Sequence, residues 1–261
     1  MPAIYAHYRF GKLILPKLPA DVRGAIQRHR SLFDAGLQGP DFLFYYKPAT
    51  KNSVSALART FHYQTGGAFF AAACRNLYSN AGEPEQAYLY GLLGHYCLDA
   101  LCHPYIGTQA RTGTVSHNAI ESEFERFLLE LDGIKRPQSY PRSRLVKLTK
   151  EDCRIVSKFY PGVTPEQVRE ATATMARSTG LITCGNPIHR AAARVVLRTL
   201  GSERPGLLIP PKADPAHAGR NEALLACFTQ ALAQYPLLLE QIRDHITFRE
   251  PFGTEFDRIF G

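Results

Sequence analysis

Side chains that commonly bind metal ions recur at a fixed spacing in the segment GHYCLDALCHP, which spans Gly94 to Pro104. Within it, His95, Asp99 and His103 follow one another at intervals of four residues. Residues four apart on an α-helix lie about 40° apart around its axis, so the three side chains would form one stripe. Imidazole nitrogen and carboxylate oxygen together suit zinc. The spacing therefore predicts a metal-binding helix face.

A second pair with the same spacing begins fourteen residues after His103, where His117 and Glu121 stand four positions apart. A pair of this kind is often an ordinary surface contact, and a single histidine on an apolar helix face is usually a packed core residue. Asp99, however, lies in an otherwise apolar stretch, where an uncompensated buried charge would cost several kcal/mol. A bound cation would compensate that charge, so we favour a metal site shared by two helices.

Three further candidates lie upstream of the two pairs. His7 stands among aromatic residues, Asp41 follows a Gly-Pro pair and precedes the run FLFYY, and His62 falls inside an expected helix. Each has an ordinary alternative: a packed histidine, an aspartate that caps a turn, or a buried histidine bonded to a carbonyl. The aromatic run is expected to be core, with an apolar wall beside the metals as the alternative.

Other chemistries lack their characteristic motifs. The chain contains no GxSxG, no glycine-rich phosphate loop and no HExxH, so a serine hydrolase, a nucleotide-binding loop and a zincin protease are not indicated. Cys97 and Cys102 flank Asp99 but point away from the stripe, and we expect both to pack in the core.

Helical periodicity dominates the chain, and alternating β-branched stretches are almost absent, which predicts an all-α fold. Pro104 is expected to end one helix, and Pro236 to kink or split another. A break or close packing is expected at Gly66. The expected helices are Pro19 to Phe33, Asn52 to Tyr78, Glu83 to Cys102, Ser116 to Leu131, Thr164 to Thr179, Pro187 to Leu200 and Gly219 to His245.

Two segments interrupt the helical pattern with several prolines, Lys135 to Arg144 and Ser202 to Ala216, and both are interpreted as loops. Neither has the composition of a flexible linker, and we find no internal repeat. We therefore expect a single-domain multi-helix bundle over residues 1–261, with the metal-binding half at about 1–131 and a helical remainder at 132–261.

Composition narrows the class of protein. No run approaches the roughly 20 apolar residues that span a bilayer, which excludes an integral membrane protein. The net charge of +8 fits an anionic partner, such as phospholipid, phosphoester or nucleic acid, without choosing among them. The first residues do not look like a signal peptide, and the six cysteines form no CxxC pair, so we expect a cytoplasmic protein.

The candidates occur in a characteristic order along the chain: His7, Asp41, His62, His95, Asp99, His103, His117 and Glu121. This order resembles the zinc-dependent phospholipase C family, whose all-α fold is shared with single-strand-specific zinc nucleases. The segments MPAIYAHYRFG, GPDFLFYY and GHYCLDALCHPYI look like the small, leaderless bacterial members of that family. The resemblance covers about residues 1–130.

The resemblance implies two zinc sites with three protein ligands each, namely His62, His95 and Asp99 for the first and His103, His117 and Glu121 for the second. Three ligands leave a coordination position for water, which favours catalysis over a closed structural site. Clustered cations lower the pKa of a bridging water and stabilise the charge on the leaving alkoxide. The implied reaction is hydrolysis of a phosphodiester.

The resemblance also implies a third ion, held by His7 and bridged by Asp99, with Asp41 as the acid-base group beside the attacking water. Secreted members of the family begin with a tryptophan that completes this third site. The present chain contains no tryptophan, so the expected number of zinc ions is two or three.

The leading functional prediction is a zinc-dependent phosphodiesterase that hydrolyses phospholipids or related phosphate esters, with peripheral contact to an anionic membrane surface. One alternative is a zinc-dependent nuclease or nucleotide phosphodiesterase of the same fold, which the positive charge favours but which lacks a visible ladder of aromatic and basic residues for stacking bases. Another is an inactive, metal-containing protein that binds a phosphorylated ligand.

Overall fold

The computed structural model describes residues 4–75, 77–78, 82–113, 115–201 and 204–260. Within these ranges the secondary structure is helical, and the one β-type pairing is an antiparallel bridge between Thr65 and Ile259. The all-α fold is thereby confirmed. The α-helices are α1 (Ile4–Ile14), α2 (Ala20–Arg28), α3 (Arg30–Gly36), α4 (Ser53–Tyr63), α5 (Gly66–Arg75), α6 (Glu83–Thr112), α7 (His117–Leu131), α8 (Lys150–Ser157), α9 (Pro165–Ile182), α10 (Pro187–Leu200) and α11 (Ala218–Phe248).

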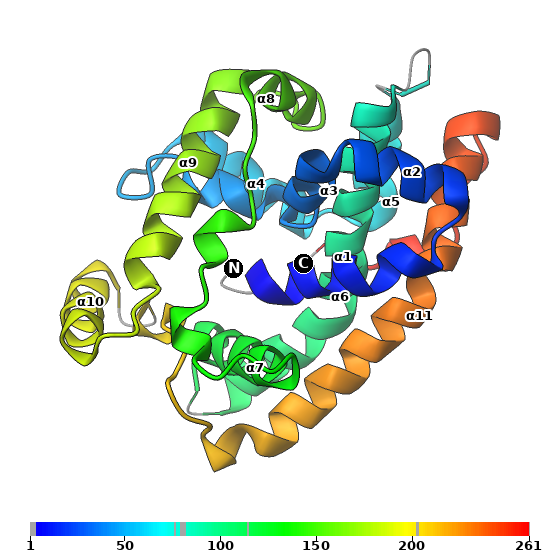
Figure 1. The fold of residues 1–261 in the computed structure, drawn as a ribbon. Helices are drawn as coiled ribbons and strands as arrows, with labels where there is room; N and C mark the ends of the chain where they lie inside the picture. The colour runs from blue at the N-terminus through cyan, green and yellow to red at the C-terminus, as the bar shows by residue number, and fades with distance from the viewer. Residues whose placement is uncertain (1–3, 76, 79–81, 114, 202–203, 261) are drawn as a thin grey trace.

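Helix α6 runs through the middle of the molecule, with α1 crossing it and the long α11 lying along it (Figure 1). Its residues from Ala87 to Ala100 are buried all round the helix, as expected of a helix that has neighbours on every side. Two of these buried residues, His95 and Asp99, are polar. The centre of the fold therefore carries the expected metal-binding stripe.

Helices α3 and α6 approach each other backbone to backbone. A Cβ atom on Gly36 would lie 2.3 Å from the carbonyl oxygen of Tyr88, and one on Gly91 would lie 2.1 Å from that of Phe33. Both positions therefore need glycine for this crossing. The crossing brings the end of α3, and with it the following 3-10 segment η2 (Gly39–Tyr45), against the middle of α6.

Neither of the two prolines that were expected to interrupt a helix ends it. Helix α6 continues past Pro104 to Thr112, and α11 contains Pro236 without being split. An interior proline costs about 3 kcal/mol, but both helices are held by packing beyond it, through Ile106 in α6 and Leu238 in α11. The turns of α6 beyond Pro104 carry Arg111.

Helix ends show where local sequence signals were sufficient. Ser116 caps α7, and Thr164 forms a capping box with Gln167 at the start of α9, so both helices begin where the expected helices begin. The expected helix over Pro19 to Phe33 is divided at His29, where the backbone leaves the helical region. The one expected over Asn52 to Tyr78 is divided into α4 and α5 just before Gly66.

Helices α1 and α8 and segment η2 were not predicted. The two expected loops contain only short 3-10 turns among their described residues. Residue 76 of the expected helix over Asn52 to Tyr78, and residues 202–203 of the second expected loop, lie outside the described residues.

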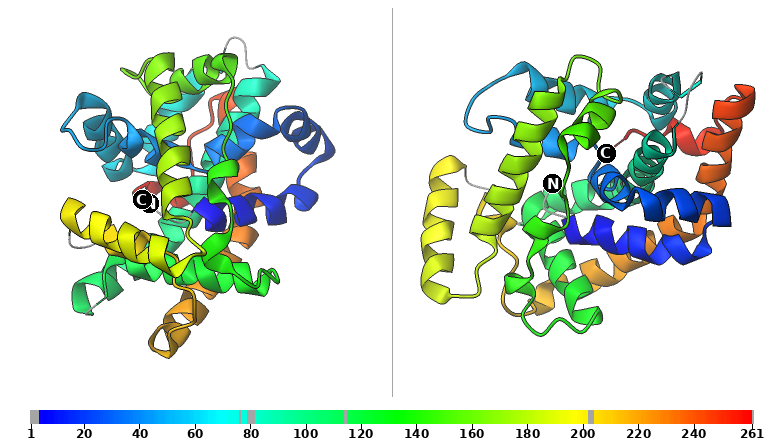
Figure 2. Two further views of the ribbon diagram at one scale, coloured as in Figure 1. Left: turned by 60° about the vertical axis from the view of Figure 1, so that its left-hand side comes forward. Right: turned by 45° about the horizontal axis from the view of Figure 1, so that its top comes forward.

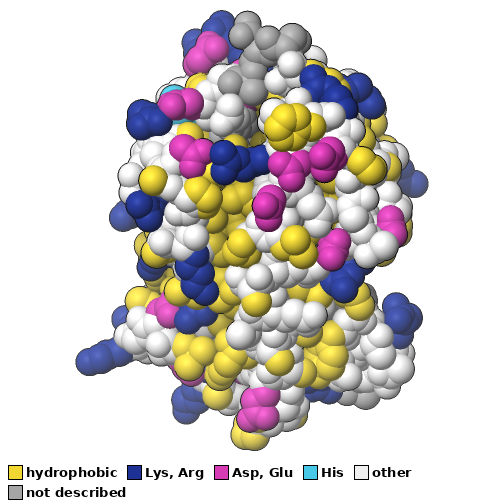
Figure 3. Space-filling view, turned by 90° about the vertical axis from the view of Figure 1, so that its right-hand side faces the viewer, with side chains coloured by type: hydrophobic (Ala, Val, Ile, Leu, Met, Phe, Trp, Pro, Cys, Tyr) yellow, Lys and Arg dark blue, Asp and Glu magenta, His cyan; other side chains and the backbone are white. Residues whose placement is uncertain are grey.

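The two halves of the chain share one hydrophobic core. Phe10 packs edge to face on Phe228 and Tyr235, which belong to α11. On the face over α2, α5 and α11, basic and acidic side chains are interspersed with apolar ones (Figure 3). The turned views show that α10 (yellow) lies at the periphery, beside α9 (Figure 2). The single-domain organisation stays a prediction.

Candidate metal centre

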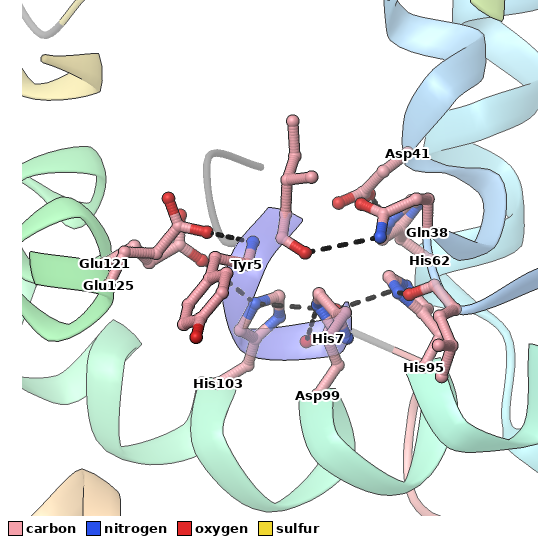
Figure 4. A network of polar contacts seen from close by, with 12 residues as sticks. Tyr5, His7, Gln38, Asp41, His62, His95, Asp99, His103, Glu121 and Glu125 are labelled. Carbon is pink, nitrogen blue, oxygen red and sulfur yellow. Dashed lines mark hydrogen bonds and ion pairs between the residues drawn. The ribbon is translucent and has the colours of Figure 1, made fainter. Parts of the chain in front are cut away.

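The eight candidate residues converge on one place from five elements of the fold, and Figure 4 labels all of them except His117. They form three groups, and the potential ligand atoms within each group lie within 4.8 Å of one another. His7 comes from α1, Asp41 from η2, His62 from α4, His95, Asp99 and His103 from α6, and His117 and Glu121 from α7.

The first group consists of Asp41, His62 and His95. Nδ1 of His62 lies 2.7 Å from the carbonyl oxygen of Ala58, and Nδ1 of His95 lies 3.3 Å from that of Leu37. Because a carbonyl oxygen can only accept, Nδ1 donates in both rings and Nε2 is directed to the group. Nε2 of His62 is 2.8 Å from Oδ1 of Asp41. Nε2 of His95 is buried and has no hydrogen-bond partner among the described residues.

Asp99 joins the first group to the others. Its Oδ1 lies 3.3 Å from Nε2 of His7, and its Oδ2 lies 3.2 Å from Nε2 of His95. The same Oδ2 is 3.6 Å from Nε2 of His103. The rings of His7 and His95 stack at 4.5 Å, and together with Asp99 they form the second group. The two carboxylate oxygens of Asp99 therefore face different sets of histidines, as a bridging ligand would require.

The third group consists of His103, His117 and Glu121. Nε2 of His117 lies 3.1 Å from Oε1 of Glu121, and Nε2 of His103 lies 3.4 Å from the same oxygen. Glu121 is buried, whereas the side chain of His117 is 36% exposed. The third group therefore reaches from the core to the solvent.

The neighbouring histidines, His103 above all, stabilise the charge of the buried carboxylates. Burial alone would raise the pKa of Asp99, but the neighbouring rings of His103, His95 and His7 lower it well below its usual range. Burial likewise opposes the charged form of His103, yet Asp99 and the hydrogen bond to Glu121 raise its pKa to about 9. His95 differs, because burial dominates and lowers its pKa to about 4.

The turn before Asp41 is shaped by the imidazole of His95. Gly39 has a φ of 52°, and a Cβ atom at this position would lie 2.2 Å from Cδ2 of His95. Glycine therefore serves two purposes here, a left-handed backbone conformation and a close approach to the ring. The turn directs Asp41 to His62, a contact that sequence spacing could not indicate.

Two residues that support His7 were missed in the sequence. Glu125 accepts a hydrogen bond from the backbone N–H of Tyr5, and its Oε2 lies 2.7 Å from Nη1 of Arg142. Both side chains of this ion pair are buried. The pair attaches α1 to α7. The available signal was the spacing, since Glu125 lies one helical turn after Glu121 on the same face.

A cleft of about 940 Å³ opens over the groups. Its polar lining includes Asp41, His62, Asp99, His103 and His117. Its apolar wall includes Phe44, Tyr63, Leu101 and Ile259. The run FLFYY thus divides between the two expected roles, because Phe42 is buried in the core and Phe44 lines the cleft.

Comparison with known proteins agrees with this geometry. The family model of the zinc dependent phospholipase C matches residues 6–160, which contain all eight candidate residues. The chain belongs to the zinc dependent phospholipase C family. No curated protein and no solved structure matches it.

Membership of the zinc dependent phospholipase C family indicates a zinc-dependent protein with phospholipase C-like activity, and the three groups could hold metal ions. The set His103, His117 and Glu121 occurs as the resemblance implied. His62 and His95, in contrast, lie together with Asp41, while Asp99 groups with His95 and His7.

None of the described helices is long and apolar enough to cross a membrane. The cytoplasmic location stays a prediction.

Proposed function

We propose that this chain is a zinc-dependent phosphodiesterase that hydrolyses phospholipids or related phosphate esters. The observation that carries the proposal is the position of Asp99, whose Oδ2 lies 3.2 Å from Nε2 of His95 in the first group and 3.6 Å from Nε2 of His103 in the third. Its Oδ1 lies 3.3 Å from Nε2 of His7. A carboxylate that connects adjacent groups of donors beneath an open cleft suits a multi-metal hydrolase better than an isolated structural ion.

The donor set fits zinc. Imidazole nitrogens and carboxylate oxygens are its usual ligands, and the buried Nε2 of His95, which faces Asp99 at 3.2 Å without forming a hydrogen bond, offers a lone pair to an ion. We propose that two ions are held by the first and third groups, with Asp99 shared. His7 and Asp99 offer a third position. Bound zinc would supply an activated water and stabilise charge on the phosphate.

The protein's own contribution is orientation and charge balance. In the structure, His62 bonds both to the Ala58 carbonyl and to Asp41, and against the effect of burial these bonds raise the pKa of His62, which favours a proton on both ring nitrogens. Loss of the proton on Nε2 would free this nitrogen and the Asp41 oxygen for a cation, and ion binding should therefore release protons. The acid-base role that the resemblance implies for Asp41 stays a prediction.

Elemental analysis of the purified protein, followed by hydrolysis assays on the same sample, tests the proposal. We expect two or three zinc ions per chain and chelator-sensitive hydrolysis of a short-chain phospholipid. Hydrolysis of a single-stranded oligonucleotide but not of phospholipids would favour the nuclease alternative instead. Zinc without turnover of any diester would favour a binding protein, and absence of bound metal would contradict the mechanism.

Helix α10 has the features of a helix that lies on a lipid surface. Leu197 is its one buried residue, whereas Ile188, Val195 and Val196 are more than half exposed. Arg194 and Arg198 are exposed on a neighbouring stripe, and α10 contains no acidic residue. Basic amphipathic helices of this type bind in the interface of anionic bilayers. We therefore propose that α10 contacts an anionic membrane surface.

The position of α10 suits this role. It packs on the 3-10 segment η5 (Arg204–Leu207), which in turn packs on α7. A Cβ atom on Gly206 of η5 would lie 2.8 Å from the backbone nitrogen of Ala119 in the first turn of α7. The same turn begins with His117 of the third group. Docking of α10 would therefore bring the cleft close to the lipid.

The double variant Val195→Ser/Val196→Ser is expected to partition at least about tenfold more weakly onto vesicles that contain one third phosphatidylserine, because two exposed apolar side chains are lost. Co-sedimentation with these vesicles and with pure phosphatidylcholine vesicles measures the effect. Leu131→Ser, which removes an exposed apolar side chain at the end of α7, serves as the matched control. Equal partitioning of the double variant and the wild type would contradict docking by α10.

A further inference from the structure

Three arginines line the cleft over the metal-binding groups. Arg59 comes from α4, Arg111 from the last turns of α6, and Arg258 from the segment that follows the 3-10 turn η7 (Thr254–Asp257). All three are exposed. Elements that are far apart in the sequence thus place guanidinium groups around one cavity.

These guanidinium groups have no carboxylate partner among the described residues. Arg59 lies 5.9 Å above the ring of Phe44, and Nη2 of Arg111 donates to the hydroxyl of Thr108 at 3.4 Å. The side chain of Arg258 forms no ion pair with the described part of the chain. Three positive charges at the cleft are therefore left uncompensated by the protein.

For a cation the cleft offers the aromatic rings of Phe44 and Tyr63, but no carboxylate outside the metal-binding groups among its described lining residues. The carboxylates among its described lining residues are Asp41 and Asp99, and both belong to the metal-binding groups. A quaternary ammonium head group would meet three guanidinium groups and no available carboxylate. A phosphate group, in contrast, would find planar, doubly donating partners.

There is also room for a second anionic group away from the metals. A neighbouring hollow of about 530 Å³ shares Phe44 and Arg59 with the cleft. Its lining includes Lys51, which adds a further positive charge. Arg59 therefore lies between the cleft, in which the phosphodiester would react, and the neighbouring hollow.

We propose that the arginines Arg59, Arg111 and Arg258 select a phosphodiester that carries a second phosphate group, and disfavour one with a cationic head group. The inference rests on the proposed function and specifies its substrate class. Phosphorylated lipid head groups and 5′-phosphorylated dinucleotides share this chemistry, and the apolar wall of the cleft favours the lipid.

The test compares kcat/KM of the zinc-loaded protein for four soluble substrates at one ionic strength: dihexanoyl phosphatidylcholine, dihexanoyl phosphatidylglycerol, dihexanoyl phosphatidylglycerol phosphate and the dinucleotide pApA. Monomeric substrates remove any contribution from surface binding by α10. We expect phosphatidylglycerol phosphate to exceed phosphatidylcholine by at least about tenfold, as charge-assisted hydrogen bonds would allow. If kcat/KM for pApA exceeds that for phosphatidylcholine by a similar factor, the second phosphate that the arginines select belongs to a nucleotide.

Each of Arg59→Gln, Arg111→Gln and Arg258→Gln should reduce this ratio of kcat/KM values at least about fivefold, and Arg59→Lys should restore part of it. Arg75→Gln, which alters an exposed arginine outside the cleft lining, should leave the ratio unchanged. A preference for phosphatidylcholine, or glutamine variants with an unchanged ratio, would overturn the inference while leaving the proposed function intact.

Calorimetric titration with 2,3-bisphosphoglycerate and with phosphocholine provides a readout that does not depend on turnover. We expect tighter binding of the bisphosphate, weakened by the three glutamine substitutions and by salt. If no diester is hydrolysed, the proposed function fails. If 2,3-bisphosphoglycerate nevertheless binds more tightly than phosphocholine, the preference for a second phosphate is that of a binding protein. Equal binding of both probes would overturn the inference in either case.

Discussion

The Asp99→Asn variant is expected to lose bound zinc and on the order of a thousandfold in phosphodiester turnover. Its carboxylate lies within 3.6 Å of ring nitrogens from His7, His95 and His103. An amide has almost the same shape but carries no charge and only one acceptor oxygen. It therefore cannot bridge two cations, and a loss of about 4 kcal/mol in transition-state stabilisation corresponds to a thousandfold in rate.

Zinc per chain and turnover should be measured on the same preparation, with circular dichroism to establish that the variant is folded. Asp34→Asn is a suitable control, because Asp34 is a half-buried carboxylate that pairs with Arg30 at 2.8 Å and belongs to none of the three groups. It should retain the metal content and the turnover of the wild type. Unchanged zinc stoichiometry in Asp99→Asn would refute the bridging role.

The Arg142→Met variant is expected to lose about 3 to 5 kcal/mol in free energy of unfolding, because it leaves a buried carboxylate without its cation. Glu125 is completely buried, and its Oε2 lies 2.7 Å from Nη1 of Arg142. Since Glu125 also binds the backbone of Tyr5, the loss should loosen α1 and with it His7. Replacing Glu125 by Gln in the same variant should recover part of the stability.

The size of this loss should depend on pH. Burial raises the pKa of Glu125 above its usual value even with Arg142 present, and removal of the arginine would raise it further. A carboxyl group whose pKa is higher in the folded than in the unfolded state stabilises the fold only when protonated, so its contribution falls as pH rises through the folded pKa. The destabilisation should therefore be smaller near pH 5 than near pH 8.

Urea unfolding of the chelated protein at both pH values measures the effect without a contribution from metal binding. Arg154→Met provides the matched control, because Arg154 and Glu151 form an exposed pair at 2.6 Å. Its loss should cost less than about 1 kcal/mol and show little dependence on pH. A small, pH-independent effect of Arg142→Met would show that the buried pair does not hold α1 in place.

Features that depend on neighbours within one helix were predictable from the sequence. The four-residue spacing of His95, Asp99 and His103 places them on one stripe of α6 because the helix has a fixed angle per residue. The expected helices began at Ser116 and Thr164, the residues that cap α7 and α9, because a cap satisfies backbone N–H groups of the first turn that follows it. The all-α fold could be inferred from such local patterns, whereas the family was inferred from the resemblance of the order of the eight candidate residues to that of its members.

The grouping of the eight residues required the packing of the helices. No spacing along the chain indicates that Asp41 meets His62, because that contact depends on the turn at Gly39 and on the close crossing of α3 and α6 at Gly36 and Gly91. Arg258 is almost two hundred positions from Arg59, yet both line one cleft. Helical periodicity sets the direction of a side chain around its own axis, whereas the distance between two axes is set by the side chains at their contact, which lie far apart in sequence.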